Sequence, residues 1–125
     1  MSDPSTPERK RVWKTPPGVT LCAEADIADP GSRGFVLQIG EAFFHGFVVR
    51  KHGEVAGYVD RCPHQGFPLA IELDRYLTPD GALILCGWHG AVFKPLSGEC
   101  VGGPCAGGRL TPWPVEAAGG IIRTA

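Results

Sequence analysis

The sequence predicts a single all-β domain made of antiparallel sheets, with a sandwich-like or barrel-like form. Its 125 residues are the usual size of one domain, and 43% of them are hydrophobic, which is enough to build a core. The 18 glycines and 12 prolines exceed average composition and indicate short regular elements joined by many loops. No window sustains helical periodicity for ten residues or more, except weakly around 69–77.

The first half of the chain predicts an arm followed by strands. Residues 1–18 contain several prolines and few apolar groups, so we expect an N-terminal arm that is flexible or packed on the domain, with Trp13 as its hydrophobic anchor. The domain itself is expected over 19–125. Runs rich in β-branched and aromatic residues and bounded by glycine predict strands. These runs cover 19–22, 35–39, 43–51 and 55–59, and His52-Gly53 predicts a hairpin turn between the last two.

The second half predicts shorter strands. Residues 73–85 are expected to form a second hairpin around Pro79-Asp80-Gly81, because proline presets φ for a turn and glycine supplies a positive φ. Many short strands separated by turns are typical of an antiparallel sandwich or small barrel. Further short strands are predicted around 91–93, 110–111, 115–116 and 121–122.

The charge and hydropathy patterns exclude several classes of partner. Twelve basic and thirteen acidic side chains give a net charge of −1, with no concentrated basic face for nucleic acid. No apolar run approaches the roughly 18 to 20 residues of a membrane span. The N-terminal sequence MSDPSTPERKRVW lacks the apolar stretch of a signal peptide. We therefore expect a cytoplasmic protein that binds neither nucleic acid nor membrane.

Two short segments carry residues suited to metal binding, CPHQG at 62–66 and CGWHG at 86–90. Each presents one cysteine and one histidine, and 21 residues separate His64 from Cys86. Both follow strand-like runs and contain glycine, so both can form tight loops at strand ends. Side by side, such loops would direct four ligand atoms at one point. Thiolate and imidazole ligands together suit zinc, or iron with sulfide.

The distribution of these ligands bears on the choice of metal. Two cysteines and two histidines can form a closed tetrahedral zinc site. Zinc fingers, however, group the cysteines in one knuckle and the histidines in another. Here each loop supplies one of each, which suits a binuclear site with both cysteines on one iron and both histidines on the other. Five cysteines is an odd number and fits a secreted disulfide framework poorly.

The two segments resemble the Rieske [2Fe-2S] family, whose pattern is C-x-H-x-G-x-x-L and later C-x-x-H-G-x-x-F. Here these motifs read CPHQGFPL at 62–69 and CGWHGAVF at 86–93, and Gly103-Pro104 matches the family's Gly-Pro loop. The resemblance spans about residues 19–125 and implies a Rieske fold: antiparallel sheets as a base and a small cluster-binding subdomain made of loops. The three loops would cover about 61–69, 86–94 and 98–108.

The resemblance also implies the ligands of one Rieske-type cluster. Cys62 and Cys86 would hold the inner ferric iron through thiolates, and His64 and His89 would hold the outer iron, which is reduced. His45 and His52 belong to no motif and are expected to face solvent. The residues expected around the cluster or in a docking patch are Gln65, Phe67, Trp88, Gly90, Gly103, Pro104 and Cys105.

Departures from the family's high-potential members imply a low reduction potential. Those members carry a disulfide between the two loops, at positions that are Phe67 and Trp88 here. They also place a serine that donates to a bridging sulfide where this chain has Ala91. Fewer donors leave the added electron less stabilised. We therefore expect a potential toward the lower end of the roughly −150 to +300 mV Rieske range.

The family's small free-standing members are ferredoxins that pass electrons from a flavin-containing reductase to a terminal ring-hydroxylating oxygenase. The resemblance therefore implies a one-electron carrier with no catalytic residues and no organic substrate of its own. Two alternatives stay open: a permanent small Rieske subunit of an oxidoreductase complex such as nitrite reductase, and a redox-sensing interaction module. The 21-residue linker is longer than in the commonest small Rieske ferredoxins, and the 73–85 hairpin would be an added feature. Cys22, Cys100 and Cys105 are expected to be packed thiols.

Overall fold

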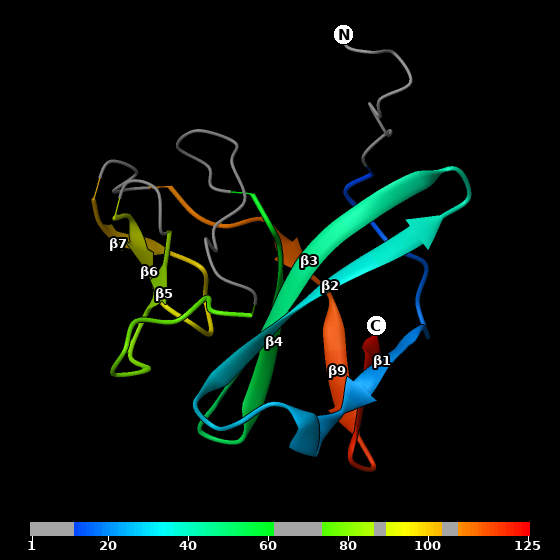
Figure 1. Ribbon diagram of the computed structural model, residues 1–125, viewed down its shortest axis with the longest axis horizontal. Coiled ribbons are helices and arrows are strands. Elements are labelled where there is room, and N and C mark those ends of the chain that lie inside the picture. The colour runs from blue at the N-terminus through cyan, green and yellow to red at the C-terminus, as the bar shows by residue number, and fades with distance from the viewer. Residues whose placement is uncertain (1–11, 62–73, 87–89, 104–107) are drawn as a thin grey trace, which may run out of the picture.

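The computed structural model describes residues 12–61, 74–86, 90–103 and 108–125, and nearly all its regular elements are strands (Figure 1). The expected all-β, antiparallel architecture is confirmed. No helix in these ranges is long and apolar enough to cross a membrane. The elements are β1 (Thr20–Ala23), the 3-10 turn η1 (Glu24–Asp26), β2 (Gly31–Ile39), β3 (Ala42–Lys51), β4 (Glu54–Val59), β5 (Ile84–Leu85), β6 (Val92–Phe93), β7 (Cys100–Gly102), β8 (Pro112–Trp113), β9 (Val115–Ala118) and β10 (Ile121–Thr124).

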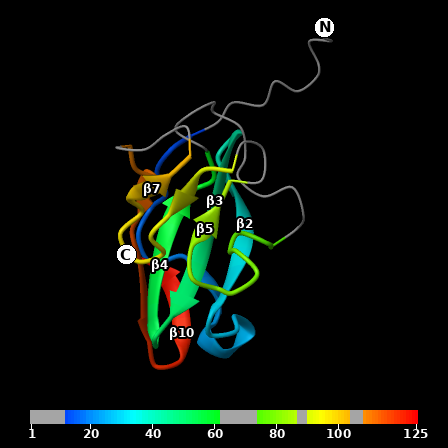
Figure 2. The same ribbon diagram turned by 90° about the vertical axis from the view of Figure 1, so that its left-hand side faces the viewer.

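Within the described residues the strands form three sheets, in the orders β2-β3-β4-β8, β1-β10-β9 and β5-β6-β7. The β3–β4 hairpin turns at His52 and Gly53, as predicted, with φ values of 54° and 77°. The Asp29 carboxylate accepts both of their backbone N–H groups, at 2.9 and 2.8 Å. Figures 1 and 2 show the β5-β6-β7 sheet on one side of the central sheet and the β1-β10-β9 sheet on the other.

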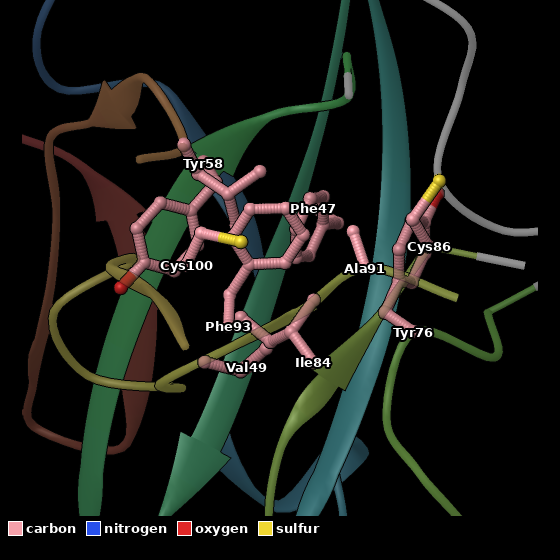
Figure 3. Close-up of a cluster of buried hydrophobic side chains, with 10 residues drawn as sticks. Phe47, Val49, Tyr58, Tyr76, Ile84, Cys86, Ala91, Phe93 and Cys100 are labelled. Carbon is pink, nitrogen blue, oxygen red and sulfur yellow. The ribbon is translucent and has the colours of Figure 1, made fainter. Parts of the chain in front are cut away.

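Strand β3 is buried on both faces and so separates two hydrophobic cores. Successive side chains of a strand point to opposite faces. Phe47 and Val49 therefore enter the first core, toward the β5-β6-β7 sheet, while Phe44 and Val48 enter the second. The first core (Figure 3) consists of Phe47, Val49, Tyr58, Tyr76, Ile84, Cys86, Ala91, Phe93, Cys100 and Leu110. The second consists of Cys22, Ile27, Phe44, Val48, Val59, Trp113 and Ile122.

Several local predictions are corrected by partners that are distant in sequence. Strand β2 begins at Gly31 rather than at residue 35, because it pairs with β3 along its whole length. Residues 100–102, expected to be loop, form β7 against β6. The predicted 73–85 hairpin is present over its described part, as a Leu77–Ile84 bridge closed by a turn at Gly81. Residues 69–73 lie outside the described ranges.

Histidines 45 and 52 differ in exposure. His52 is exposed at the β3–β4 turn, as expected. His45 was expected to face solvent but is half-buried. It lies within β3, whose two faces are both covered, and its backbone oxygen accepts the Asp60 N–H at 3.0 Å.

The described part of the arm, residues 12–18, lies against the domain and is held by hydrogen bonds. The Val12 N–H donates to the Phe43 oxygen at 3.0 Å, and the Trp113 indole N–H donates to Thr15 Oγ1 at 2.9 Å. Val12 is the arm's contact with the second core, whereas the expected anchor, Trp13, is 44% exposed. Trp13 does not enter the core. The boundary at residue 18 stays a prediction.

Replacing Thr15 with valine tests the arm's attachment. Thr15→Val removes the acceptor of the Trp113 indole N–H, and Trp113 is only 2% exposed. An unpaired buried donor costs about 1–3 kcal/mol, so the free energy of unfolding in urea should fall by that amount. The control Thr20→Val changes an exposed β1 residue and should stay within about 0.5 kcal/mol of the native value. Equal losses in both variants would contradict this account.

Candidate metal centre

The second predicted ligand loop is closed by its own backbone. The Cys86 N–H donates to the Ala91 oxygen at 2.8 Å, and the Gly90 N–H donates to the Cys86 oxygen at 3.0 Å. Gly90 has a φ of 75°, which glycine adopts without strain. Strands β5 and β6 pair on either side of this loop. Cys86 is thus held at the base of a tight loop, where its thiol is free and fully buried.

Gly103 brings the third predicted loop against the second. Its φ is 86°, and a Cβ at this position would lie 2.6 Å from Ala91 Cα and 3.0 Å from the Gly90 oxygen. Only a residue without a side chain permits this approach. The Gly-Pro loop therefore approaches the second ligand loop closely at Gly103. Pro104 and Cys105, which complete that prediction, lie outside the described residues.

The entry to the first ligand loop is linked to the second loop through Tyr76. Asp60 follows β4 and comes two residues before Cys62. Its Oδ2 accepts the Tyr76 hydroxyl at 2.9 Å. The Tyr76 backbone oxygen accepts the Leu85 N–H at 2.8 Å, and Leu85 directly precedes Cys86. Figure 3 shows Tyr76 and Cys86 at the same side of the first core.

Tyr76 is held as a hydrogen-bond donor by its surroundings. Its ring stacks on Phe47, with centroids 4.1 Å apart and planes 5° from parallel. Burial is the main cause that raises the pKa of the Tyr76 phenol, and the Asp60 carboxylate raises that pKa further. The hydroxyl consequently stays protonated across the physiological range, and it donates to Asp60 throughout.

Two of the three unassigned cysteines are packed thiols, as expected. Cys22 lies in the second core, apart from Cys86 in the first. Burial raises the pKa of the Cys22 thiol, with Arg33 opposing the shift, so its reactive thiolate form is disfavoured. Cys100 is buried in β7, where its thiol donates to the Gly102 oxygen at 3.2 Å.

The structure therefore describes part of the predicted site. Cys86, Gly90 and Gly103 lie close to one another. No group of three potential metal-binding side chains occurs within the described ranges. Asp60 and Tyr76 belong to no sequence motif and were not predicted; the one available signal was that Asp60 closely precedes Cys62. The predicted site residues outside the described ranges are Cys62, His64, Gln65, Phe67, Trp88, His89, Pro104 and Cys105.

These features fit a Rieske cluster. Cys86 offers a buried thiol without a disulfide partner, and backbone hydrogen bonds join it to Gly90 and Ala91 at the other end of the loop. Gly103 has no side chain, and a Cβ at this position would block the approach of the third loop to the second. A soft thiolate in an apolar setting is a ligand typical of iron–sulfur clusters.

Comparison with known proteins agrees with this interpretation. The family model described as Rieske [2Fe-2S] domain matches residues 18–114. No curated protein sequence matches the chain.

Solved structures similar to this chain include a complex of reduced oxygenase and oxidized ferredoxin in carbazole 1,9a-dioxygenase, with a TM-score of 0.67, 25% identity and coverage of 86% of this chain and 91% of that chain. The Sphingomonas yanoikuyae B1 ferredoxin has a TM-score of 0.62 at 24% identity, covering 85% and 95% of the two chains. The ferredoxin of carbazole 1,9a-dioxygenase from Nocardioides aromaticivorans IC177 has a TM-score of 0.65 at 17% identity, covering 89% and 98%. The chain belongs to the Rieske [2Fe-2S] domain family and carries one cluster of that type.

Proposed function

We propose that this chain is a one-electron carrier whose cluster is held by Cys62 and Cys86 on one iron and by His64 and His89 on the other. The cluster supplies the redox chemistry, because it accepts and returns a single electron. The observation that carries the proposal is the free, fully buried Cys86 thiol in a self-closed loop. Tyr76 links this loop to the residue that lies two positions before Cys62.

The described residues around Cys86 support a low reduction potential. Ala91, Ile84 and Phe93 are fully buried in the same core as Cys86, and none of their side chains can donate a hydrogen bond. Reduction adds negative charge to a cluster, and side-chain donors would stabilise that charge. Their lack at these three positions favours the oxidised form.

We further propose that the chain works in the cytoplasm, between a flavin-containing reductase and a terminal oxygenase. Support comes from the similar structures, which include a complex of ferredoxin with an oxygenase and a ferredoxin of a dioxygenase. Their identity to this chain, 17–25%, relates chiefly the folds, so electron transfer itself has to be measured.

Anaerobic stopped-flow absorbance tests this placement. The oxidised protein would be mixed with a flavin reductase and NADH, and the reduced protein with oxygenase components of ring-hydroxylating dioxygenases, including carbazole 1,9a-dioxygenase. We expect reduction in the first mixture, reoxidation in the second, and rates that change with salt, as in transient electrostatic docking. A large subunit that co-purifies stoichiometrically would contradict a free carrier and favour a permanent small subunit.

Substitution of the proposed ligands should abolish the mixed-ligand cluster. His64→Ala and His89→Ala each remove a ligand of the outer iron, and Cys86→Ala removes one from the inner iron. We expect loss of the EPR signal of a cluster with histidine and cysteine ligands. The control His52→Asn alters an exposed turn residue with φ of 54°, a conformation that asparagine tolerates, and should keep the signal. An unchanged spectrum in any of the ligand variants would refute that assignment.

Adding a donor at residue 91 should raise the reduction potential. Ala91→Ser places a hydroxyl in the closed Cys86–Ala91 loop, where it can donate to the cluster. One hydrogen bond of about 1 kcal/mol corresponds to roughly 40 mV for a one-electron couple, so we expect a positive shift of that order in a redox titration. The control Ala82→Ser adds the same group at an exposed position outside the loop and should not change the potential. A shift to lower potential in Ala91→Ser would contradict the proposed tuning.

A further inference from the structure

Tyr76 makes contacts with several separate parts of the fold. Its ring stacks on Phe47 of β3, and its hydroxyl donates to Asp60 at the end of β4. Its backbone oxygen accepts the Leu85 N–H from β5. Gly34 of β2 leaves room for the hydroxyl, since a Cβ there would lie 2.8 Å from it. The tyrosine thus sits where the strands leading to both ligand loops meet.

The backbone of Tyr76 is held independently of its hydroxyl. The Tyr76 N–H donates to Ser32 Oγ at 3.1 Å, and Ser32 Oγ in turn donates to the Asp74 oxygen at 2.8 Å. The Asp74 carboxylate accepts the Gly34 N–H at 2.7 Å. These bonds attach residues 74–76 to β2. Loss of the hydroxyl alone would therefore leave the tyrosine backbone and its bond to Leu85 in place.

We propose that Tyr76 is a positioning residue, which fixes the entry of the first ligand loop relative to the base of the second and so determines how firmly the cluster is retained. The inference rests on the proposed function, because it assumes that Cys62 and Cys86 are ligands. It also assigns a role to the predicted 73–85 hairpin, which supplies the tyrosine. The Tyr76 hydroxyl supplies the hydrogen bond to Asp60, whereas the Tyr76 backbone oxygen supplies the bond to Leu85.

Tyr58 provides a matched control within the same core. It is 3% exposed, and its ring contacts Phe47 at a centroid distance of 5.7 Å. Burial raises the pKa of the Tyr58 phenol. The Tyr58 hydroxyl, like the Tyr76 hydroxyl, therefore acts as a hydrogen-bond donor. Its hydroxyl, however, donates to the Pro95 oxygen at 2.8 Å, in the connection between β6 and β7 rather than at a ligand-loop entry.

The experiment compares Tyr76→Phe with Tyr58→Phe in the cluster-loaded protein. Loss of the visible absorbance is followed in the presence of an iron chelator, and EPR of the reduced protein reports the cluster's ligand geometry. Local opening that is easier by about 1–2 kcal/mol raises the open population about 5- to 30-fold. We expect cluster loss to speed up by such a factor, with a broadened EPR signal, in Tyr76→Phe. Tyr58→Phe should lose its cluster at close to the native rate. Equal rates and spectra in the two variants would overturn the proposal.

Substitutions of Asp60 separate positioning from general destabilisation. Asp60→Asn keeps an oxygen that can accept the Tyr76 hydroxyl, whereas Asp60→Ala does not. We expect the asparagine variant to lose its cluster more slowly than the alanine variant. Identical rates would count against the hydroxyl link.

A cluster-independent measurement distinguishes failure of this inference from failure of the proposed function. If the native protein lacks the mixed-ligand EPR signal, the proposed function fails. The link is then read from amide hydrogen exchange in peptides that contain Asp60 and Leu85. Faster exchange at Asp60 in Tyr76→Phe than in Tyr58→Phe supports the link between the two loop entries, and equal exchange overturns it.

Discussion

The burial of β3 on both faces is the constraint on which the rest of the structure depends. Phe44 and Phe47, three residues apart on this strand, enter opposite cores. Gly46 between them is required, since a Cβ there would lie 2.6 Å from Phe44 and 2.7 Å from Trp113. One sheet can therefore pack on each face of the central sheet. A shift of β3 by one residue would exchange its two faces, and both outer sheets would lose the apolar side chains that they pack against.

The first core gives the cluster-binding loops a rigid base. Short strands such as β5 and β6 pair over only two residues each and would not be stable alone. Their side chains Ile84 and Phe93 are fully buried against Phe47 and its neighbours, which holds the strands in place. Cys86 and Ala91 belong to the same core. The loop between them is rich in glycine, but β5 and β6, which flank it, pack on β3 and so hold its two ends in position.

Local patterns predicted the long hairpin well and the short elements poorly. The long hairpin was recognisable because two runs rich in β-branched and aromatic residues, 43–51 and 55–59, flank a short turn sequence. That turn, His52-Gly53, adopts positive φ. The glycine-containing start of β2 and strand β7 were missed, since each is formed by pairing with a partner strand rather than by its own propensity. Trp13 was expected to anchor the arm, but it is largely exposed. The arm is attached instead by the Trp113 indole N–H, which donates to Thr15, and by the Val12 N–H, which donates to Phe43.

The sequence by itself determined the family and its cofactor, because the cysteine and histidine ligands of a cluster occur at short, fixed spacings within single loops. The match to the family's Gly-Pro loop also predicted that glycine is needed at residue 103. Only the tertiary structure decided how the loop entries are joined. Asp60 and Tyr76 are 16 residues apart and share no sequence pattern. Their hydrogen bond forms because the Tyr76 ring stacks on Phe47 of β3, which holds its hydroxyl near the end of β4. A contact between distant segments depends on packing, which no local spacing encodes.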